Sequence, residues 1–314
     1  MDGSIARPRP MLALGIRLLS ILTLATMAML LKLAAERGAH LLEMIFWRQA
    51  VTAVLIAAIL AAGGQLASVR TQRFKAHTMR AISGITGMVF VYGAILLLPL
   101  AEATVISFTT PFFAVMISVI LFGERVGIYR ASAVALGFAG ILVIVSGGDT
   151  SVSLAIDPWG LIVGLVAAIL VPFISFQIQD LNKTESPWTI VFWFAVLTTP
   201  LAALSLPFVA SAHDPQTWAL IGAMALCGAI AQMLLTSSLR FGSAAVIMVM
   251  DYTALIWATI YGWYVFENVP SPGVWLGAPL VIGAGLLITY RERKIAAKKA
   301  EHIHSSASAA DKSA

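Results

Sequence analysis

The chain has 314 residues, of which 60% are hydrophobic and only 11% are charged. A soluble domain carries about 25% charged residues, so this composition excludes an ordinary soluble protein and makes lipid the main solvent. The formal charge of +5 could suit nucleic acid, but the basic residues are spread over short loops without a nucleic-acid-binding motif. We therefore expect the lipid bilayer, and no nucleic acid, as a partner.

Ten apolar runs follow one another along the chain, each near the roughly 20 residues that a membrane-spanning helix needs. The separators are short and contain helix breakers such as Ser186-Pro187 and Asp214-Pro215. The sequence predicts an all-α membrane protein with ten transmembrane helices and a basic, disordered cytoplasmic tail at 291–314. The predicted helices cover approximately 11–35, 42–62, 78–98, 101–123, 129–147, 158–178, 187–207, 216–238, 242–265 and 273–290.

Lys and Arg are distributed unevenly between the predicted loops. Of the 20 basic residues, 16 lie in or beside the N-terminal segment, alternate loops and the C-terminal tail. The other loops contain only Arg37. Because short cytoplasmic loops are enriched in Lys and Arg, this bias predicts that both termini are cytoplasmic.

Short motifs recur in the same order in both halves of the chain, at offsets of 141 to 146 residues. The matching segments are Phe46-Trp47-Arg48 with Phe192-Trp193-Phe194, 101–106 with 242–247, and 140–144 with 285–288. We interpret 11–147 and 158–290 as two repeats of five helices each. An odd number of helices places the second repeat in the opposite orientation, and such inverted repeats are a recurring design of secondary transporters. The alternative is a duplication that only builds a stable scaffold.

Asp251 is the sharpest candidate for a coupling residue, because it lies near the middle of the ninth predicted helix. An ionisable side chain at that depth is costly and must face a partner, water or a proton. Asp251 could couple transport to a proton or bind a cation. Alternatively, it is a structural carboxylate that accepts hydrogen bonds from neighbouring Ser, Thr or Tyr side chains.

Arg48 lies about 9 Å inside the second predicted helix, at 1.5 Å per residue, and the other half has Phe194 at the matching position. A guanidinium there could hold a substrate carboxylate or phosphate in a bidentate contact. The alternative, slightly favoured by the sequence, is a structural role in which Arg48 extends toward the interface or pairs with Glu43.

The remaining charged residues near the spans, Arg17, Lys32, His77 and Arg80, are expected at the membrane interfaces. Pro111 lies in the middle of the fourth predicted helix, where it frees a backbone carbonyl that nearby threonines can satisfy. The complete set of candidates for substrate binding or coupling is Trp47, Arg48, Thr109, Thr110, Pro111, Gln232, Asp251, Tyr252 and Trp257.

Several signatures of other functions are absent from the sequence. No G-x-x-x-x-G-K-[ST] phosphate-binding loop and no H-E-x-x-H or Cys/His cluster occurs. No clustered catalytic side chains can be identified. We therefore expect no enzyme activity, no cofactor and no metal.

These residues resemble the drug/metabolite transporter superfamily, in particular its ten-helix EamA-type members, over 11–290. The resemblance is carried by LPLAEATVISFTTP at 98–111, Phe122-Gly123-Glu124, Asp251-Tyr252-Thr253 and 266–270, with Lys32, Glu43 and Arg48 matching the first-half pattern. The first-half motif is especially similar to S-adenosylmethionine and riboflavin uptake members. In contrast to many members, Tyr252 stands near the position of a second-half proline.

The resemblance implies a bacterial inner-membrane protein that moves metabolites down or against gradients. It implies a central cavity lined mainly by the first, third, fourth, sixth, eighth and ninth helices. The expected function is secondary transport of a small organic metabolite by a monomer or homodimer, with S-adenosylmethionine, riboflavin, amino acids or drugs as candidate substrates. The alternative is a non-transporting membrane scaffold or sensor subunit.

Overall fold

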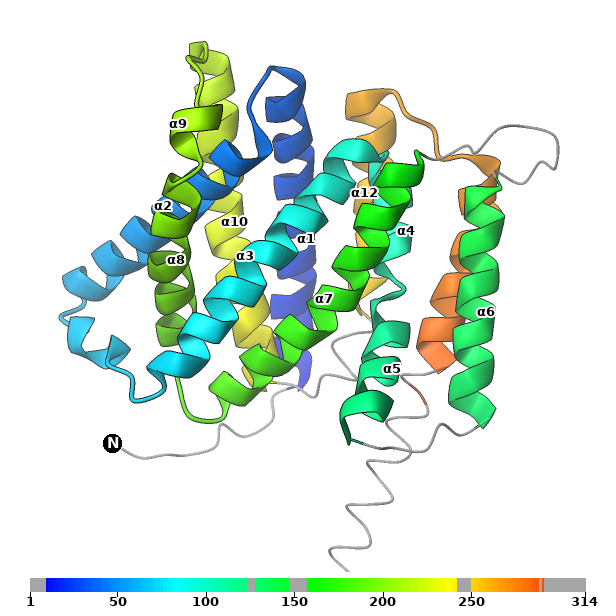
Figure 1. Ribbon diagram of the computed structural model, residues 1–314, viewed down its shortest axis with the longest axis horizontal. Coiled ribbons are helices and arrows are strands. Elements are labelled where there is room, and N and C mark those ends of the chain that lie inside the picture. Colours follow the sequence, from blue (N-terminus) through cyan, green and yellow to red (C-terminus); the bar gives the residue numbers. More distant parts are fainter. Residues whose placement is uncertain (1–9, 123–127, 147–156, 242–249, 288–289, 291–314) are drawn as a thin grey trace, which may run out of the picture.

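The computed structural model describes residues 10–122, 128–146, 157–241, 250–287 and 290. The predicted tail at 291–314, the first part of the ninth predicted helix at 242–249 and the loop at 123–127 lie outside these residues. In the described part the chain is helical without strands, as predicted (Figure 1). The helices are α1 (Pro10–Glu36), α2 (Leu41–Ala62), the 3₁₀ helix η1 (Leu66–Val69), α3 (Phe74–Leu97), α4 (Leu100–Ser107), α5 (Thr110–Phe122), α6 (Ile128–Val145), α7 (Pro158–Asn182), α8 (Pro187–Ala203), α9 (Leu206–Val209), α10 (Pro215–Phe241), α12 (Ala254–Phe266) and the helix Pro272–Leu287.

Five of the described helices are long and apolar enough to cross a bilayer, and five shorter apolar helices accompany them. The long ones lie within α1, α2, α3, α7 and α10. Large apolar side chains point outward along the bundle, including Leu142 and Ile256 with relative exposures of 69% and 58%. An exterior of this kind is solvated by lipid, so the chain is a multi-pass membrane protein.

The predicted breakers start helices through side-chain caps. Ser186 accepts a hydrogen bond from the backbone N–H of Thr189 at 3.2 Å, and α8 then begins at Pro187. Asp157 caps α7 in the same way through Gly160 N–H at 2.9 Å. A proline in the first helical turn loses no hydrogen bond, because its nitrogen would have no partner there.

The fourth predicted helix is two helices rather than one. The run 101–123 divides into α4 and α5 at a turn formed by Phe108 and Thr109, two residues before Pro111. Similarly, the run 187–207 ends as α8 followed by the short α9. The α4–α5 break is where a proline removes a backbone donor, in agreement with the expected kink.

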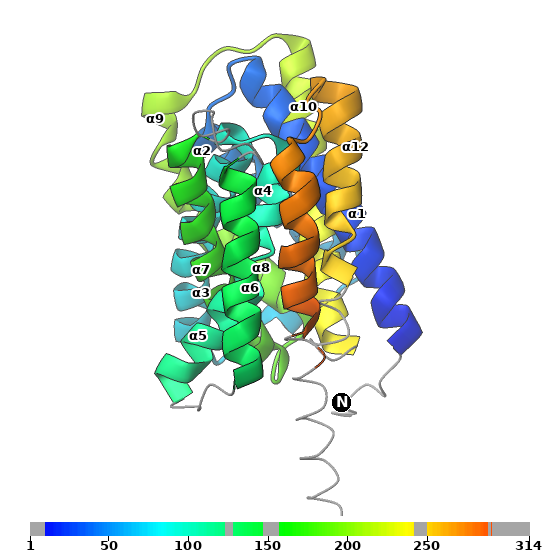
Figure 2. The same cartoon turned by 90° about the vertical axis from the view of Figure 1, so that its right-hand side faces the viewer.

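Three pairs of long helices form the body of the bundle: α1 with α10, α3 with α7, and α2 with α8 (Figure 1). In Figure 2, α6 and the helix Pro272–Leu287 run side by side at the other flank. Glycines permit this close approach, because a Cβ added to Gly277 would lie 2.5 Å from the carbonyl oxygen of Gly140. One apolar core fills the space beneath α6, around Phe112, Ile144 and Val281. A second joins α1, α2, α3 and α10 around Leu31, Met44 and Met224.

Candidate functional site

Arg48 lies at the centre of a buried polar cluster in the middle of α2, with a relative exposure of only 4%. Its Nη1 donates to Gln49 Oε1 at 2.9 Å, and its Nη2 donates to Gln232 Oε1 at 3.2 Å and to the carbonyl of Gly228 at 3.5 Å. The structure therefore brings together two of the predicted site residues, Arg48 and Gln232. The structural alternative predicted that Arg48 extends to the interface or pairs with Glu43. Both predictions are wrong for the described residues, because the side chain is buried and its hydrogen-bond partners do not include Glu43.

A second guanidinium, that of Arg80 in α3, is buried beside this cluster. Arg80 has a relative exposure of 3%, and its Cζ lies 4.0 Å from the centroid of the Phe194 ring. Arg48 is close enough for its charge to repel that of Arg80. The prediction that Arg80 is interfacial is wrong, because the side chain folds inward along α3 over Gly84, which leaves room for it.

The surroundings of Arg48 and Phe194 correspond residue by residue. A Cβ added to Gly228 would lie 2.6 Å from Arg48 Nε, and one added to Gly84, 144 residues earlier, would lie 2.5 Å from Phe194 Cε2. The backbone behind the two side chains is also matched: the carbonyls of Arg48 and Phe194 each accept a hydrogen bond, at 2.6 Å, from a threonine hydroxyl four residues later. Each side chain thus occupies an equivalent glycine-lined position, but one is a cation and the other a ring.

The break between α4 and α5 has a counterpart before α12. Thr109 Oγ1 donates to the carbonyl of Ile106 at 2.7 Å, and Thr253 Oγ1, 144 residues later, donates to the carbonyl of Met250 at the same distance. In both places the same carbonyl also accepts the backbone N–H of the threonine, at 3.0 and 2.9 Å, so the amide and the hydroxyl together hold the turn. The second break forms without a proline, so Tyr252 does not remove the correspondence.

The two breaks meet in the interior of the bundle. The rings of Phe108 and Tyr252, one from each break, make an edge-to-face contact with centroids 4.9 Å apart. Pro111 follows directly in α5, and Thr110 begins that helix. Four predicted candidates, Thr109, Thr110, Pro111 and Tyr252, are therefore grouped around these breaks, separately from the guanidinium cluster.

Asp251 directly precedes the second break and is held by Arg17 of α1. Arg17 Nε and Nη2 donate to the two carboxylate oxygens at 2.6 and 2.7 Å. The expected extension of Arg17 toward the interface is wrong, since its side chain is 12% exposed and bidentate to Asp251. Proton uptake by Asp251 would first require this ion pair to open. The sequence did not reveal the pair, because its members are 234 residues apart.

Matched His–Glu pairs lie at the two ends of the bundle. We call them the α9 end, where α2 and α10 begin, and the η1 end, where α3 and α8 begin (Figure 1). At the α9 end, His213 Nε2 lies 2.9 Å from Glu43 Oε2. At the η1 end, His77 Nε2 lies 2.6 Å from Glu185 Oε2. All four side chains are at most 9% exposed, so His77 is not the interfacial side chain that the sequence predicted.

Aromatic residues surround each His–Glu pair in the same pattern. Trp47 makes an edge-to-face contact with Trp218 at the α9 end, with centroids 5.4 Å apart. Trp193 makes the equivalent contact with Phe74 at the η1 end, also at 5.4 Å. The structure thus places Trp47 in a terminal cluster rather than beside the guanidinium of Arg48.

Ion pairs tie the neighbouring helices at each end, with their signs exchanged. Arg37, which follows α1, lies 3.7 Å from Asp214 before α10. At the η1 end the basic residue, Arg73, instead precedes α3 and contacts Asp180 of α7. A hydrogen bond from the Thr217 hydroxyl lowers the pKa of the exposed Asp214 carboxyl below its usual value.

Two further predictions concern side chains outside these clusters. Lys32, which was expected at the interface, has its Nζ near two helix ends: it donates to the carbonyl of Leu98 at 2.6 Å and lies 5.6 Å from the Phe266 ring centroid. Trp257 is partly buried in α12. The resemblance implied a cavity lined in part by the first and sixth predicted helices, which are α1 and α7 in the structure. The buried guanidinium cluster lies on other helices, namely α2, α3, α8 and α10.

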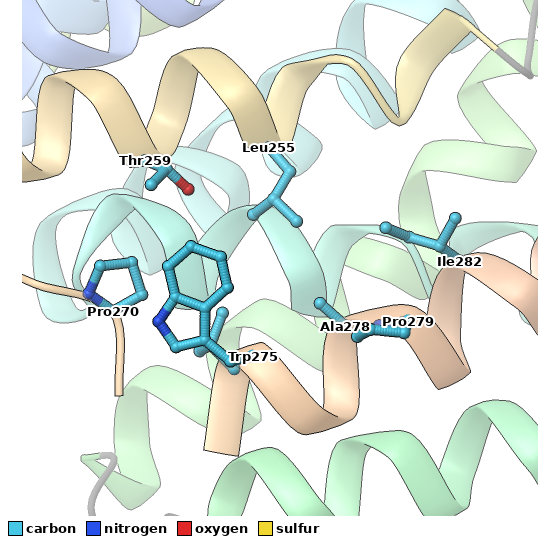
Figure 3. A pocket seen from close by; sticks show the side chains of 8 residues that line it. Leu255, Thr259, Pro270, Trp275, Ala278, Pro279 and Ile282 are labelled. Atoms are coloured by element: carbon cyan, nitrogen blue, oxygen red, sulfur yellow. The ribbon is translucent and has the colours of Figure 1, made fainter. Parts of the chain in front are cut away.

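An apolar hollow lies between α12 and the helix Pro272–Leu287, with a volume of about 170 Å³ (Figure 3). Its walls include Leu255, Pro270, Trp275 and Ile282, and Thr259 is the polar side chain at its rim. Trp275 is 62% exposed, so the hollow opens on the lipid-facing flank. It lacks the charged groups of the central cluster. Among the described residues, no group of three His, Cys, Asp or Glu side chains could hold a metal ion.

Comparisons with known proteins agree with a transport function. The chain is 29% identical to a riboflavin transporter of Rhizobium johnstonii over 230 residues, 73% of this chain and 74% of that protein. It is 27% identical to a pseudopaline exporter of Pseudomonas aeruginosa over 279 residues, which cover 87% and 95% of the two chains. It is 26% identical to an S-adenosylmethionine uptake transporter of Rickettsia bellii, over 83% and 87%.

One solved crystal structure has the same fold, with a TM-score of 0.63 at 19% identity, and the match covers 91% of this chain and 99% of that one. The model of the EamA-like transporter family matches residues 11–146 and 158–290. The apolar helices, the buried polar centre and these matches agree, and the chain belongs to the EamA-like transporter family.

Proposed function

We propose that this protein is a secondary active transporter that moves a small organic metabolite across the bacterial inner membrane by alternating access. The two moving units are the inverted repeats at 11–147 and 158–290, and both termini are cytoplasmic. The observation that carries the proposal is the pair of matched helix breaks, whose Phe108 and Tyr252 rings meet between two equivalently closed ends.

Matched closures suit a mechanism in which either end can open. The Glu43–His213 pair links α2 to α10, and the Glu185–His77 pair links α8 to α3. Opening one end breaks one buried pair while the other stays intact, so the two open states have similar costs. A gradient, or a substrate that binds one open state only moderately more tightly than the other, is then sufficient to shift the populations of the two open states.

The helix breaks provide the positions at which such a rearrangement can occur. Residues 108–109 and 252–253 form turns at the ends of helical segments, and the Thr109 and Thr253 hydroxyls donate to the carbonyls of Ile106 and Met250. Discontinuous helices at the midplane are common in secondary transporters, where the broken backbone lines the binding site. The half-helices on either side can therefore rotate about Phe108 and Tyr252 without exposing an unpaired backbone group to lipid.

Asp251 is the proposed coupling residue, acting through its bridge to Arg17. Asp251 lies directly before the turn at 252–253, so opening or closing of the Arg17–Asp251 ion pair can change the angle between the segments on either side of that turn. The matching position in the first half is Ser107, which hydrogen-bonds only within its own helix turn. Opening of the bridge frees the carboxylate for a proton or another cation, which couples transport to a gradient.

The relatives suggest candidate substrates but leave the direction open. Their names specify riboflavin transport, S-adenosylmethionine uptake and pseudopaline export. S-adenosylmethionine, riboflavin, amino acids and drugs are the proposed candidates for this chain.

Flux through purified protein in proteoliposomes tests the proposal. A panel of radiolabelled metabolites is measured with and without an imposed proton gradient, and protein-free vesicles serve as the control. We expect saturable flux of at least one compound, stimulated by the gradient and abolished by Asp251→Asn. Absence of flux for every compound would overturn the proposal in favour of a scaffold or sensor subunit.

A further inference from the structure

Two buried cations in the bundle have no counter-ion among the residues that the structure describes. Arg48 and Arg80 are 4% and 3% exposed. No ion pair joins either of them to a carboxylate in the part of the chain that the structure describes. The Arg80 guanidinium instead packs on the uncharged ring of Phe194, whose centroid lies 4.0 Å from its Cζ.

This arrangement differs from that of the other charged groups inside the bundle. Arg17 is neutralised by Asp251, and His77 and His213 each have a glutamate. Removing a charge from water costs several kcal/mol even after relaxation of the protein. Two like charges within one interior cost more, because they repel each other. The matching positions of the second half hold Met224 and Phe194. The fold therefore does not require cations at these positions.

Several donors of the two guanidiniums also have no acceptor. Arg48 Nε, Arg80 Nε and Arg80 Nη1 are buried without a hydrogen-bond partner. A buried polar group that lacks a partner carries the full desolvation penalty. An oxyanion offers what these donors lack, since it carries several lone pairs and a negative charge together.

A continuous set of contacts connects the two arginines across one turn of α8. Arg48 donates to Gln49, and Gln49 Nε2 donates to the hydroxyl of Thr198. Thr198 donates in turn to the carbonyl of Phe194 at 2.6 Å, and the Phe194 ring supports Arg80. Both guanidiniums are therefore held in defined positions, which lowers the entropic cost of binding a ligand between them.

We propose that Arg48 and Arg80 form a central binding site for an oxyanion, so that the transported solute is an organic anion with a carboxylate or phosphate group. This inference rests on the proposed transport function and specifies the substrate class at its site. Gly84 and Gly228 leave room for the two arginine side chains themselves, which pack directly against them. Because both cations belong to the first half, the second half contributes the amide of Gln232 and the ring of Phe194, which contact other parts of the solute.

Direct binding to the purified full-length protein in lipid nanodiscs tests the site without any gradient. Two matched pairs of probes differ only by their anionic groups: riboflavin 5′-phosphate with riboflavin, and succinate with succinamide. Flavin fluorescence reports the first pair, and calorimetry reports the second. The first pair tests a phosphate and the second a carboxylate, so the two sources of the oxyanion are distinguished.

We expect at least one anionic probe to bind at least about tenfold more tightly than its neutral partner, since a hydrogen bond to a charged group contributes about 1.5–3 kcal/mol. Arg48→Gln and Arg80→Gln should each remove this preference. Arg48→Lys should retain part of it, because the charge remains while the bidentate geometry is lost. Arg70→Gln is the matched control, since Arg70 is exposed at the η1 end.

Three results would overturn the proposal: no preference for either anion, a preference that survives both glutamine variants, or an equal loss in Arg70→Gln. Thermal unfolding separates a binding defect from misfolding, because removal of an uncompensated buried charge should leave the melting temperature unchanged or higher. Failure of the transport proposal looks different: anion binding persists while proteoliposomes show no flux. Conversely, flux of a neutral or cationic solute that is unaffected by Arg48→Gln would refute this inference and leave transport intact.

Discussion

The two glycine-lined positions at the centre of the bundle share their backbone but differ in what occupies them. Gly228 faces the guanidinium of Arg48, whereas Gly84 faces the ring of Phe194 together with the guanidinium of Arg80 from its own helix. The threonines behind them make identical hydrogen bonds. The comparison teaches that matching glycines and threonines keep the same backbone arrangement in both halves. The halves differ in the side chain that this arrangement holds, and that side chain determines which solute group could be contacted. The ends show the same principle, since their His–Glu pairs match and their ion pairs exchange sign.

The largest expected effect comes from making the two central positions alike. Arg48→Phe places a ring against both glycines and removes the proposed anion contact. Transport of an anionic substrate should fall by roughly 100-fold, since a charged hydrogen-bonded contact of about 1.5–3 kcal/mol is lost together with the bidentate geometry. Initial rates in proteoliposomes measure this effect. A variant that transports normally would show that the difference between the two positions has no functional role.

A second substitution breaks the close contact between α6 and the helix Pro272–Leu287. An alanine at Gly277 would approach the Gly140 carbonyl and the Ile144 side chain to 2.5 Å, so the backbones must separate. We expect a loss of about 1–3 kcal/mol of stability, measured by thermal unfolding in detergent. Gly283→Ala is the control in the same helix, because no atom lies within 4 Å of its added Cβ. Equal melting temperatures for the two variants would contradict the close packing.

The third prediction separates the two ends. Glu43→Gln should weaken the pair with His213, and Glu185→Gln should weaken the pair with His77, because each removes a carboxylate from a buried contact. Amide hydrogen exchange should accelerate by about tenfold near the altered pair, which corresponds to about 1.4 kcal/mol. The first variant should affect the starts of α2 and α10, and the second those of α3 and α8. Acceleration at both ends in either variant would argue against independent closures.

The smallest expected effect concerns the helix breaks. Thr109→Val and Thr253→Val each remove one hydroxyl that donates to a carbonyl of the turn. Each should destabilise the protein by about 1 kcal/mol, and the two losses should be similar if the breaks are equivalent. Thr23→Val is a suitable control, since its hydroxyl bonds within an unbroken helix. Thermal unfolding of the three variants gives the comparison, and a loss confined to one break would show that the correspondence is only geometric.

The sequence indicates buried polar residues better than it indicates their partners. Arg48, Gln232 and Asp251 were recognised because polar groups in apolar runs are costly. Their contacts were not, since Arg17 and Asp251 are 234 residues apart and Glu43 and His213 are 170 apart. Arg80 and His77 were assigned to the interface because they lie near the start of a span. Their inward orientation depends on Gly84 and on the neighbouring α8, which no local pattern encodes.

The sequence by itself determined that this is an all-helical membrane protein of a transporter family, and it indicated where matching segments and symmetry breaks lie. Those properties depend on composition, on the length of apolar runs and on local motifs, all of which can be seen in the sequence. Only the tertiary structure decided which charges are neutralised and which are not. Arg17 pairs with Asp251, whereas Arg48 contacts amide and carbonyl oxygens and Arg80 packs on the Phe194 ring. Contacts between helices depend on how distant segments pack rather than on their spacing in the chain.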